Sequence, residues 1–323
     1  MTPAADKPDL LVLQAMAPPE VMASLAEHFQ CHLLYQVVPE NRAALLYRLA
    51  PCLQLAVTSA SVGMDEALLA QLPALRMLAV YGVGLDRVPL DALARLGVAV
   101  SNTPDVLTDD VADLAVLLTL AAARRLPQVD AYVRAGQWGR RAPLALGRGV
   151  GGKVAGIYGF GRIGQAVAHR MTALGMRVCY HQPRRRAEVS LPYYDSLLAL
   201  AEASDYLLVC APGRPETRHA VNAEVLAALG REGTLVNVAR GSVVDEAALL
   251  AALQQGRLGA AALDVFEDEP HPLAALLAQP NVVLTPHIGS MTLETRSAMG
   301  RLVLDNLLAY IGGRPLLTPV SPD

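Results

Sequence analysis

Short apolar runs alternate with amphipathic stretches along the first third of the chain. Apolar runs bounded by turn residues, the pattern of buried strands, occur at 10–13, 31–37, 55–58, 77–80 and 98–100. Stretches with the spacing of amphipathic helices separate these runs, at 20–29, 42–49, 65–70 and 90–96. This alternation of strands and helices predicts a first α/β unit of about 100 residues.

A second alternating region begins beyond a long apolar helix. Thr108–Asp110 can cap this helix, which is predicted to continue to Leu126. Further strands are predicted at 154–158, 177–181, 206–210, 234–238, 260–264 and 282–284. A final helix at 293–311 follows the turn at 286–290 and can return the chain to the first unit. The pattern therefore predicts two α/β units.

Composition and charge narrow the class of protein. The 323 residues are about twice the usual length of one domain, and 53% of them are apolar, so two packed cores are expected. A formal net charge of −3 gives no general attraction to a polyanion, so we expect neither a nucleic-acid nor a membrane partner. The longest apolar stretch, Leu114–Ala123, is shorter than the roughly 20 residues that a membrane span needs, and favours a core or interface helix.

The cysteines and the amino terminus indicate a reducing compartment. The four cysteines match neither a metal-ligand spacing nor a dense disulfide framework, so we expect reduced thiols and no metal site. The segment Met1–Leu13 carries Asp6 and Asp9 and lacks the apolar core of a secretory signal. A cytoplasmic location is therefore expected.

A glycine motif follows the strand predicted at 154–158 and opens a helix. In this context Gly159 permits a tight turn, Gly161 lets the backbone approach a pyrophosphate, and Gly164 lets helix and strand pack closely. The phosphates would lie at the helix N-terminus. The motif therefore predicts a dinucleotide site with contacts from Gly159, Gly161, Arg162, Ile163 and Gly164.

The residues after the following strand favour NADP(H) over NAD(H). NAD-specific sites usually carry an acidic residue about 20 positions past the motif, where it binds the ribose 2′-hydroxyl. Here Gln182 stands in that region, and Arg184, Arg185 and Arg186 follow it. A neutral Gln does not repel a 2′-phosphate, and Arg184 and Arg185 can bind it. The alternative is that the arginines belong to a solvated loop.

Three other motifs each follow a predicted strand, at 236–241, 263–270 and 285–290. Because the carboxyl ends of parallel strands face the ligand crevice, Arg240, Glu269 and His287 can converge. Arg240 can hold a carboxylate and polarise a carbonyl, His287 can donate a proton, and Glu269 can favour the charged form of His287. These roles suit the reduction of a 2-oxo acid. Taken singly, the three residues are ordinary surface, loop and turn residues, and Glu267 or Asp268 could instead be the carboxylate that acts on His287.

At these residues the sequence resembles the D-isomer-specific 2-hydroxyacid dehydrogenase family. The Arg of N-x-A-R-G, the Glu of D-V-F-x-x-E-P and the His of P-H-I-G are catalytic in that family, and the resemblance covers nearly the whole chain. It implies that Asp264 contacts the nicotinamide amide and that Thr108, Pro212 and Arg240 line the cofactor cleft. It also implies that the loop 81–86 offers backbone N–H groups to the substrate carboxylate. The substrate contacts implied are Val83, Gly84 and Arg240.

The resemblance also implies an architecture and an activity. We expect two doubly wound α/β domains, a Rossmann dinucleotide-binding domain at 101–290 and a discontinuous flavodoxin-like substrate domain at 1–100 and 291–323. The loop 82–86 and the missing ribose carboxylate look most like NADPH-linked glyoxylate, hydroxypyruvate and hydroxyphenylpyruvate reductases. A homodimer is expected from the family and from the apolar helix.

Two alternatives remain at this point. A dinucleotide-sensing corepressor can share this fold and retain the three catalytic residues, although no basic tail or partner segment is present here. A formate- or phosphite-type dehydrogenase belongs to the same superfamily, but formate enzymes pair the His with a Gln, where this chain has Glu269.

Overall fold

The computed structural model describes residues 7–320 and divides into two compact units. The first unit contains the described residues up to Leu107 together with those from Met291 onward, and the second is Thr108–Ser290. Residues 101–107, which the sequence pattern assigned to the second unit, remain with the first because Ser101 bridges Pro319 and the Thr103 N–H donates to the Gly82 carbonyl. The expected lack of a secretory signal rests on residues 1–13. Of these, residues 1–6 lie outside the described residues.

A five-stranded parallel sheet forms the centre of the first unit, with the order β2-β1-β3-β4-β5. Its strands are β1 (Asp9–Val12), β2 (Gln30–Leu33), β3 (Leu55–Ser59), β4 (Met77–Tyr81) and β5 (Ala99–Ser101). This is the flavodoxin-like order, in which the strand order reverses at β1. The strand predicted at 31–37 corresponds to β2, which ends earlier, at Leu33. Its partner strand β1 ends at Val12, opposite Leu33, and a 3₁₀ turn, Leu34–Gln36, follows.

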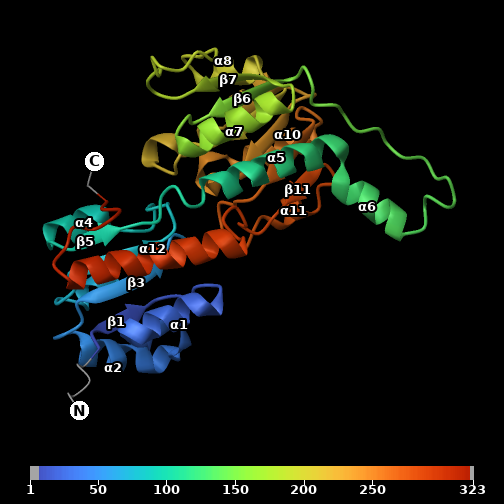
Figure 1. Cartoon of the computed structure of the whole chain (residues 1–323). Coiled ribbons are helices and arrows are strands. Elements are labelled where there is room, and N and C mark those ends of the chain that lie inside the picture. The colour runs from blue at the N-terminus through green and yellow to red at the C-terminus, as the bar shows by residue number, and fades with distance from the viewer. Residues whose placement is uncertain (1–6, 321–323) are drawn as a thin grey trace. The chain divides into compact units, whose positions relative to one another are not determined.

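Helices cover both faces of this sheet. They are α1 (Pro19–His28), α2 (Pro39–Leu49), α3 (Glu66–Ala70), α4 (Leu90–Arg95) and α12 (Leu293–Ile311). Leu46, Leu69 and Leu93 from α2, α3 and α4 pack with Leu11 and Leu78 of the strands in one core cluster. On the other face α12 packs against β4 and α1, which brings the C-terminal helix back to the first unit (Figure 1).

A six-stranded parallel sheet forms the centre of the second unit, with the order β11-β10-β9-β8-β6-β7. Its strands are β6 (Val154–Tyr158), β7 (Arg177–His181), β8 (Tyr206–Val209), β9 (Thr234–Asn237), β10 (Ala260–Leu263) and β11 (Val282–Leu284). The strand order reverses at β6, which lies between β7 and β8. Both sheets are parallel with helices between the strands, so the prediction of two doubly wound α/β units is confirmed.

The helices of the second unit also form two layers. They are α5 (Thr108–Arg124), α6 (Leu126–Arg134), α7 (Arg162–Ala173), α8 (Leu197–Glu202), α9 (Ala223–Leu229), α10 (Glu246–Gln254) and α11 (Ala274–Leu277). The apolar stretch within α5 is mostly core, because Leu114, Ala115 and Leu118 are buried against this unit's own sheet and α7. The helix ends at Arg124, before Leu126. Arg125 has a left-handed φ of 54° and caps α6, which begins at Leu126 with Pro127 in its first turn. In Figure 1, α6 and the segment after it extend away from the strands.

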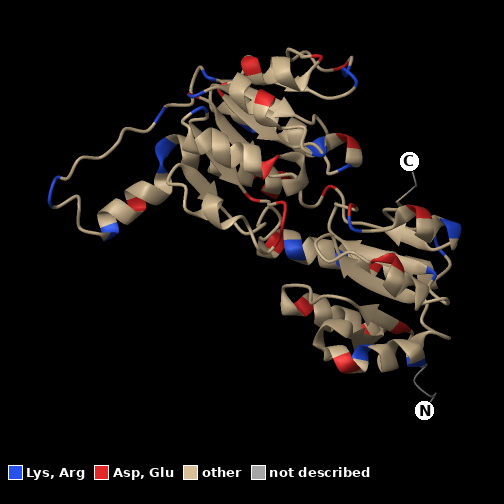
Figure 2. Ribbon diagram, turned by 180° about the vertical axis from the view of Figure 1, so that it is seen from behind, with Lys and Arg blue, Asp and Glu red and all other residues tan. Residues whose placement is uncertain are grey.

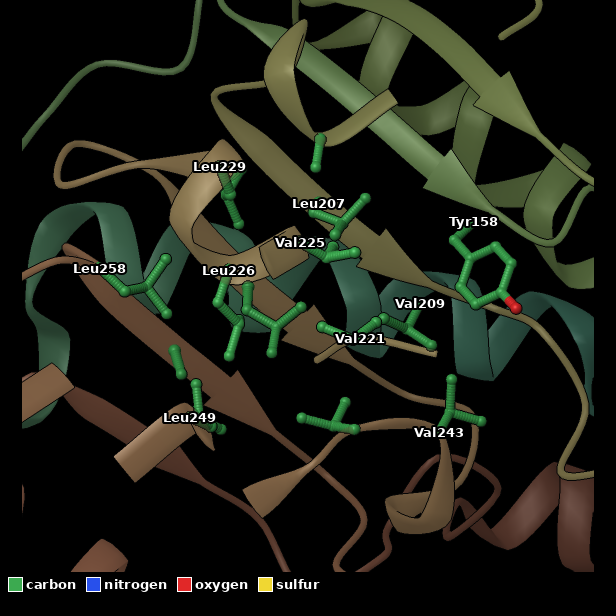
Figure 3. Packing of buried hydrophobic residues seen from close by; sticks show 14 of the residues in the cluster. Tyr158, Leu207, Val209, Val221, Val225, Leu226, Leu229, Val243, Leu249 and Leu258 are labelled. Atoms are coloured by element: carbon green, nitrogen blue, oxygen red, sulfur yellow. The ribbon is translucent and has the colours of Figure 1, made fainter. Parts of the chain in front are cut away.

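The core of the second unit fills the space between the sheet and the layer of α8, α9 and α10. Leu207 and Val209 of β8 point into this space and meet Val225 and Leu226 of α9 and Leu249 of α10 (Figure 3). Leu207 is fully buried. The core holds the strands in register, and it thereby fixes the strand ends from which the functional loops leave.

Charged residues are interspersed along both units. Basic and acidic positions alternate over the ribbons without a continuous basic stripe in this view (Figure 2). Among residues 7–320, no helix is both long enough and apolar enough to cross a membrane. The expected absence of a nucleic-acid partner stays a prediction.

We predict that Leu207→Ala destabilises the second unit by about 2–5 kcal/mol, the usual cost of opening a cavity in a packed core. Urea unfolding measures this free energy. Leu277→Ala is the matched control, because Leu277 is 51% exposed in the same unit and should cost less than about 1 kcal/mol. Equal losses in the two variants would contradict the assigned core.

Candidate active site

The glycine loop lies at the point where the strand order of the second sheet reverses. It leaves the carboxyl end of β6, and the neighbouring loop leaves β8. Gly159 has φ of 91°, and a Cβ there would lie 2.5 Å from the Ala211 nitrogen in that neighbouring loop. A Cβ on Gly164 would lie 2.1 Å from the Gly159 oxygen. Glycine at both positions is therefore required for the two loops and α7 to pack this closely.

The N-terminus of α7 fits a pyrophosphate. Gly161 is the N-cap residue, and a Cβ built on it would meet nothing within 4 Å, so the space before the helix is open. The first N–H groups of a helix have no partner within the helix, and the helix dipole favours an anion there. Arg162, Ile163 and Gly164 form this first turn, and their contact with phosphates stays a prediction.

The loop after β7 is attached to the glycine loop through Arg186. The Arg186 guanidinium donates from Nη1 to the Phe160 carbonyl at 3.2 Å and from Nε to Glu188 at 2.7 Å. Gln182 donates from Nε2 to the Arg184 carbonyl at 2.6 Å. Residues Arg184 and Arg185 are exposed, whereas Arg186 holds the loop.

Pro212 and Thr108 lie at different parts of the second unit. Pro212 follows β8, and its carbonyl accepts from the Thr217 hydroxyl at 2.7 Å. The next residue is Gly213, and a Cβ built on it would lie 2.9 Å from the Arg240 side chain. Thr108 opens α5, which packs along α7. Arg170 of α7 holds Asp109 at 2.9 Å, which ties the start of α5 to the helix that the glycine loop opens.

Arg240 is placed by a tight turn after β9. Asn237, which is buried, donates from Nδ2 to the Arg240 carbonyl at 2.9 Å and accepts from the Ala239 N–H at 3.0 Å. A Cβ on Gly241 would lie 1.9 Å from the carbonyl carbon of Phe266, so only glycine lets this turn lie against the loop after β10. Arg240 is thereby brought to the loop that carries Glu269.

Glu269 and His287 are in direct contact. His287 Nδ1 lies 2.8 Å from Glu269 Oε2, and the Phe266 N–H donates to Glu269 Oε1 at 3.0 Å. The side chain of His287 is 38% exposed and that of Glu269 is 22% exposed, so the imidazole reaches solvent while the carboxylate lies deeper. Two loops, after β10 and after β11, supply this pair.

Glu269 stays ionised in this position. Burial opposes its charged form, but the hydrogen bond and charge of His287, the Phe266 N–H and the charge of Arg240 outweigh burial and lower the pKa of Glu269. An ionised carboxylate only accepts hydrogen bonds, so His287 Nδ1 must carry the proton of their shared bond. Nε2 is then the nitrogen of His287 that can gain and lose a proton.

The turn that carries His287 is built on Asp264. This carboxylate is 1% exposed and accepts from the Thr285 hydroxyl at 2.6 Å, the Ile288 N–H at 2.8 Å and the Gly289 N–H at 2.9 Å. Burial raises the pKa of Asp264, and these donors together with the charge of His287 oppose that rise. His287 has a left-handed φ of 54°, which costs a residue with a side chain about 1–2 kcal/mol.

A second histidine and carboxylate pair lies nearby and was missed by the sequence analysis. His219 Nε2 contacts Glu267 Oε1, and Arg218 lies 3.9 Å from the same carboxylate. Glu267 is therefore engaged away from His287, and the carboxylate observed on His287 is that of Glu269. No motif marks His219, because its partner is defined only by the approach of two loops distant in sequence.

The predicted substrate loop belongs to the first unit. It follows β4: the Gly82 N–H donates to the Thr103 hydroxyl at 3.0 Å, and Asn102 donates to the Val83 carbonyl at 3.1 Å. These bonds fix the backbone around Val83, whose side chain is exposed, and Gly84 follows in the same loop.

Comparisons with known proteins agree with these features. Residues 116–289 match the family model described as D-isomer specific 2-hydroxyacid dehydrogenase, NAD binding domain. The chain is 47% identical to glyoxylate/hydroxypyruvate reductase A of Arabidopsis thaliana over 82% of this chain and 84% of the relative. It is 42% identical to the 2-ketogluconate reductase of Gluconobacter oxydans, over 98% and 99% of the two chains.

A solved structure extends the likeness to the whole fold. The NADPH-dependent glyoxylate/hydroxypyruvate reductase of Sinorhizobium meliloti, determined with NADP and malonate, is 40% identical and superimposes with a TM-score of 0.88. The match covers 98% of this chain and 97% of that one. With the family model, the relatives and the fold in agreement, the chain belongs to the D-isomer-specific 2-hydroxyacid dehydrogenase family.

Proposed function

We propose that this protein reduces glyoxylate, hydroxypyruvate or a similar small 2-oxo acid to the D-2-hydroxy acid with NADPH. The observation that carries the proposal is the contact of His287 with an ionised Glu269, on the sheet edge that also bears Arg240 and the glycine loop. NADPH supplies the hydride for the carbonyl carbon when it is bound. The oxidation of the hydroxy acid uses the same side chains in reverse.

His287 is the proposed general acid. Its Nδ1 proton is held by Glu269, so Nε2 delivers the proton to the substrate oxygen as the carbonyl is reduced. In the protonated form that this step requires, the imidazolium charge lies against the carboxylate of Glu269. The loss of the Nε2 proton leaves a neutral imidazole, which is the form that the reverse oxidation needs.

Arg240 is the proposed substrate anchor. A guanidinium group can hold the carboxylate of a 2-oxo acid and stabilise the negative charge that develops on the carbonyl oxygen. The backbone N–H groups of Val83 and Gly84 are the proposed further contacts of the substrate carboxylate. The resemblance of the loop 82–86 to reductases of this family supports that assignment.

The residues around the glycine loop support binding of the dinucleotide. The N-terminus of α7 takes the pyrophosphate, Asp264 is the proposed partner of the nicotinamide amide, and Thr108 and Pro212 are proposed to line the cleft. Gln182 and the exposed Arg184 and Arg185 are the proposed partners of the adenosine ribose and its 2′-phosphate. Charge-assisted bonds of about 1.5–3 kcal/mol each favour the phosphate.

We expect the purified protein to oxidise NADPH in the presence of glyoxylate or hydroxypyruvate, with kcat/KM for NADPH at least about tenfold above that for NADH. Absorbance of the reduced nicotinamide measures both rates. A protein that binds NADPH but turns over neither acid would contradict the function. Equal efficiencies with the two dinucleotides would contradict only the assigned cofactor preference.

Arginine variants test which residues cause the preference for NADPH. Replacing both Arg184 and Arg185 with Ala should weaken NADPH more than NADH, because only NADPH presents a phosphate there. Arg257→Ala removes an exposed guanidinium elsewhere on the same unit and should leave the ratio unchanged.

The pH dependence follows from the charge of Glu269. Its lowered pKa keeps the pair with His287 intact at neutral pH, and the pair is lost as the pH falls through that lowered value. Gln cannot be protonated in this range, so the loss of carbonyl reduction that protonation of Glu269 causes at low pH should be absent in Glu269→Gln, and the overall rate should be lower because the carboxylate charge is gone. Rates measured against pH for wild type and variant test this, and superimposable profiles would falsify the pairing.

We also propose that the protein is a homodimer. Support comes from large apolar side chains left exposed on α5, on α6 and on the segment that follows: Leu117, Leu126, Val133, Trp138 and Leu146. Leu146 is 92% exposed, and several large apolar side chains exposed along one part of the chain favour association.

Light scattering should therefore report twice the mass of one chain. Leu146→Asp should lower the mass toward that of a monomer at micromolar concentration, because a charge in an apolar interface is costly to desolvate. Tyr47→Asp is the control at an equally exposed position of the first unit, where Tyr47 is 86% exposed. A monomeric wild-type protein would contradict the proposal.

A further inference from the structure

Three successive N–H groups of the turn after β11 converge on one residue. The His287 N–H donates to the Asp264 carbonyl at 2.8 Å, the Ile288 N–H to Asp264 Oδ1 at 2.8 Å and the Gly289 N–H to Asp264 Oδ2 at 2.9 Å. The Thr285 hydroxyl completes this set with a 2.6 Å bond to Oδ1. Asp264 directly follows β10, so the turn is attached to the neighbouring strand end.

This set of bonds holds His287 in a conformation that it would otherwise leave. A left-handed backbone is unfavourable for histidine and persists only where the surroundings over-determine it. The turn has to keep that conformation for the imidazole to reach Glu269, which is carried by a different loop. Loss of one bond to Asp264 would therefore release part of the constraint on His287.

We propose that Thr285 is a positioning residue of the reaction: through its hydroxyl bond to Asp264 it holds the left-handed turn that aims His287 at Glu269. The proposal rests on the proposed function, because it takes His287 as the general acid. It assigns a second task to Asp264, whose carboxylate organises the turn as well as facing the expected nicotinamide amide.

Substitutions of Thr285 distinguish the two proposed roles of Asp264, in the turn and at the cofactor. A change of Asp264 itself would alter the turn and the cofactor contact together. A change of Thr285 removes one bond from the turn and leaves the carboxylate in place, and the Thr285 hydroxyl has no assigned contact with substrate or cofactor. Thr285→Val keeps the size and the branching of the side chain and removes the hydroxyl.

The test compares glyoxylate reduction by Thr285→Val and Thr285→Ser. The Val variant should lose about 10- to 100-fold in kcat, the range for a misplaced catalytic group, with the Kd for NADPH within about twofold of wild type. Its rate profile against pH should differ from that of wild type, since His287 no longer lies against Glu269. Thr285→Ser keeps the donor and should restore kcat to within about threefold of wild type, together with the wild-type pH profile.

Matched variants make the result decisive. Thr119→Val removes a buried hydroxyl that donates within α5, to the Ala115 carbonyl at 2.7 Å, and should leave kcat and the pH profile unchanged. If circular dichroism shows that Thr285→Val is unfolded, Thr285→Ala removes the same hydroxyl with less steric demand and takes its place.

Two outcomes overturn the inference. One is a folded Thr285→Val or Thr285→Ala with wild-type kcat and pH profile, and the other is a loss of kcat that Thr285→Ser does not restore. His287→Ala distinguishes failure of this inference from failure of the proposed function. Wild-type turnover in His287→Ala would show that His287 is not the general acid and would contradict the proposed function. An inactive His287→Ala together with a normal Thr285→Val would overturn the role of Thr285 alone.

Discussion

The hydrogen bond between His287 Nδ1 and Glu269, 2.8 Å long, is the interaction on which the chemistry depends. It decides which nitrogen of the imidazole exchanges a proton. Burial works against the charge on Glu269, but His287, the Phe266 N–H and the charge of Arg240 together lower the pKa of this carboxyl group. The acid is therefore a property of several loops together, and no single residue accounts for it.

Parallel strands explain how those loops meet. The register of β9, β10 and β11 brings Asn237, Leu263 and Leu284 to the same edge, and the turns that follow carry Arg240, Glu269 and His287. At the other end of the same edge, the reversal of strand order at β6 leaves room for the glycine loop. One sheet thus carries the glycine loop and the contact of His287 with Glu269 along a single edge.

Much of this fold could be predicted from the sequence, because hydrophobic period marks buried strands and helices locally. The strands of the second unit, the helix Leu293–Ile311 and the glycine motif all follow from neighbouring residues. The break at Arg125 and the early end of β2 were not predicted. The break depends on the left-handed backbone of Arg125, and the end of β2 depends on the length of its partner strand β1. The contacts of Asp264 and His219 were also missed, because loops distant in sequence create them.

A crystal structure with NADPH and oxamate, an unreactive isostere of a 2-oxo acid, would show whether His287 is placed to act as the acid. We expect the carboxylate of oxamate on the Arg240 guanidinium and its carbonyl oxygen within hydrogen-bond distance of His287 Nε2, with Nδ1 still on Glu269. We also expect the amide carbonyl carbon to face the nicotinamide. Oxamate bound with its carbonyl oxygen away from His287, or His287 turned from Glu269 in the complex, would contradict the role of His287 as the general acid.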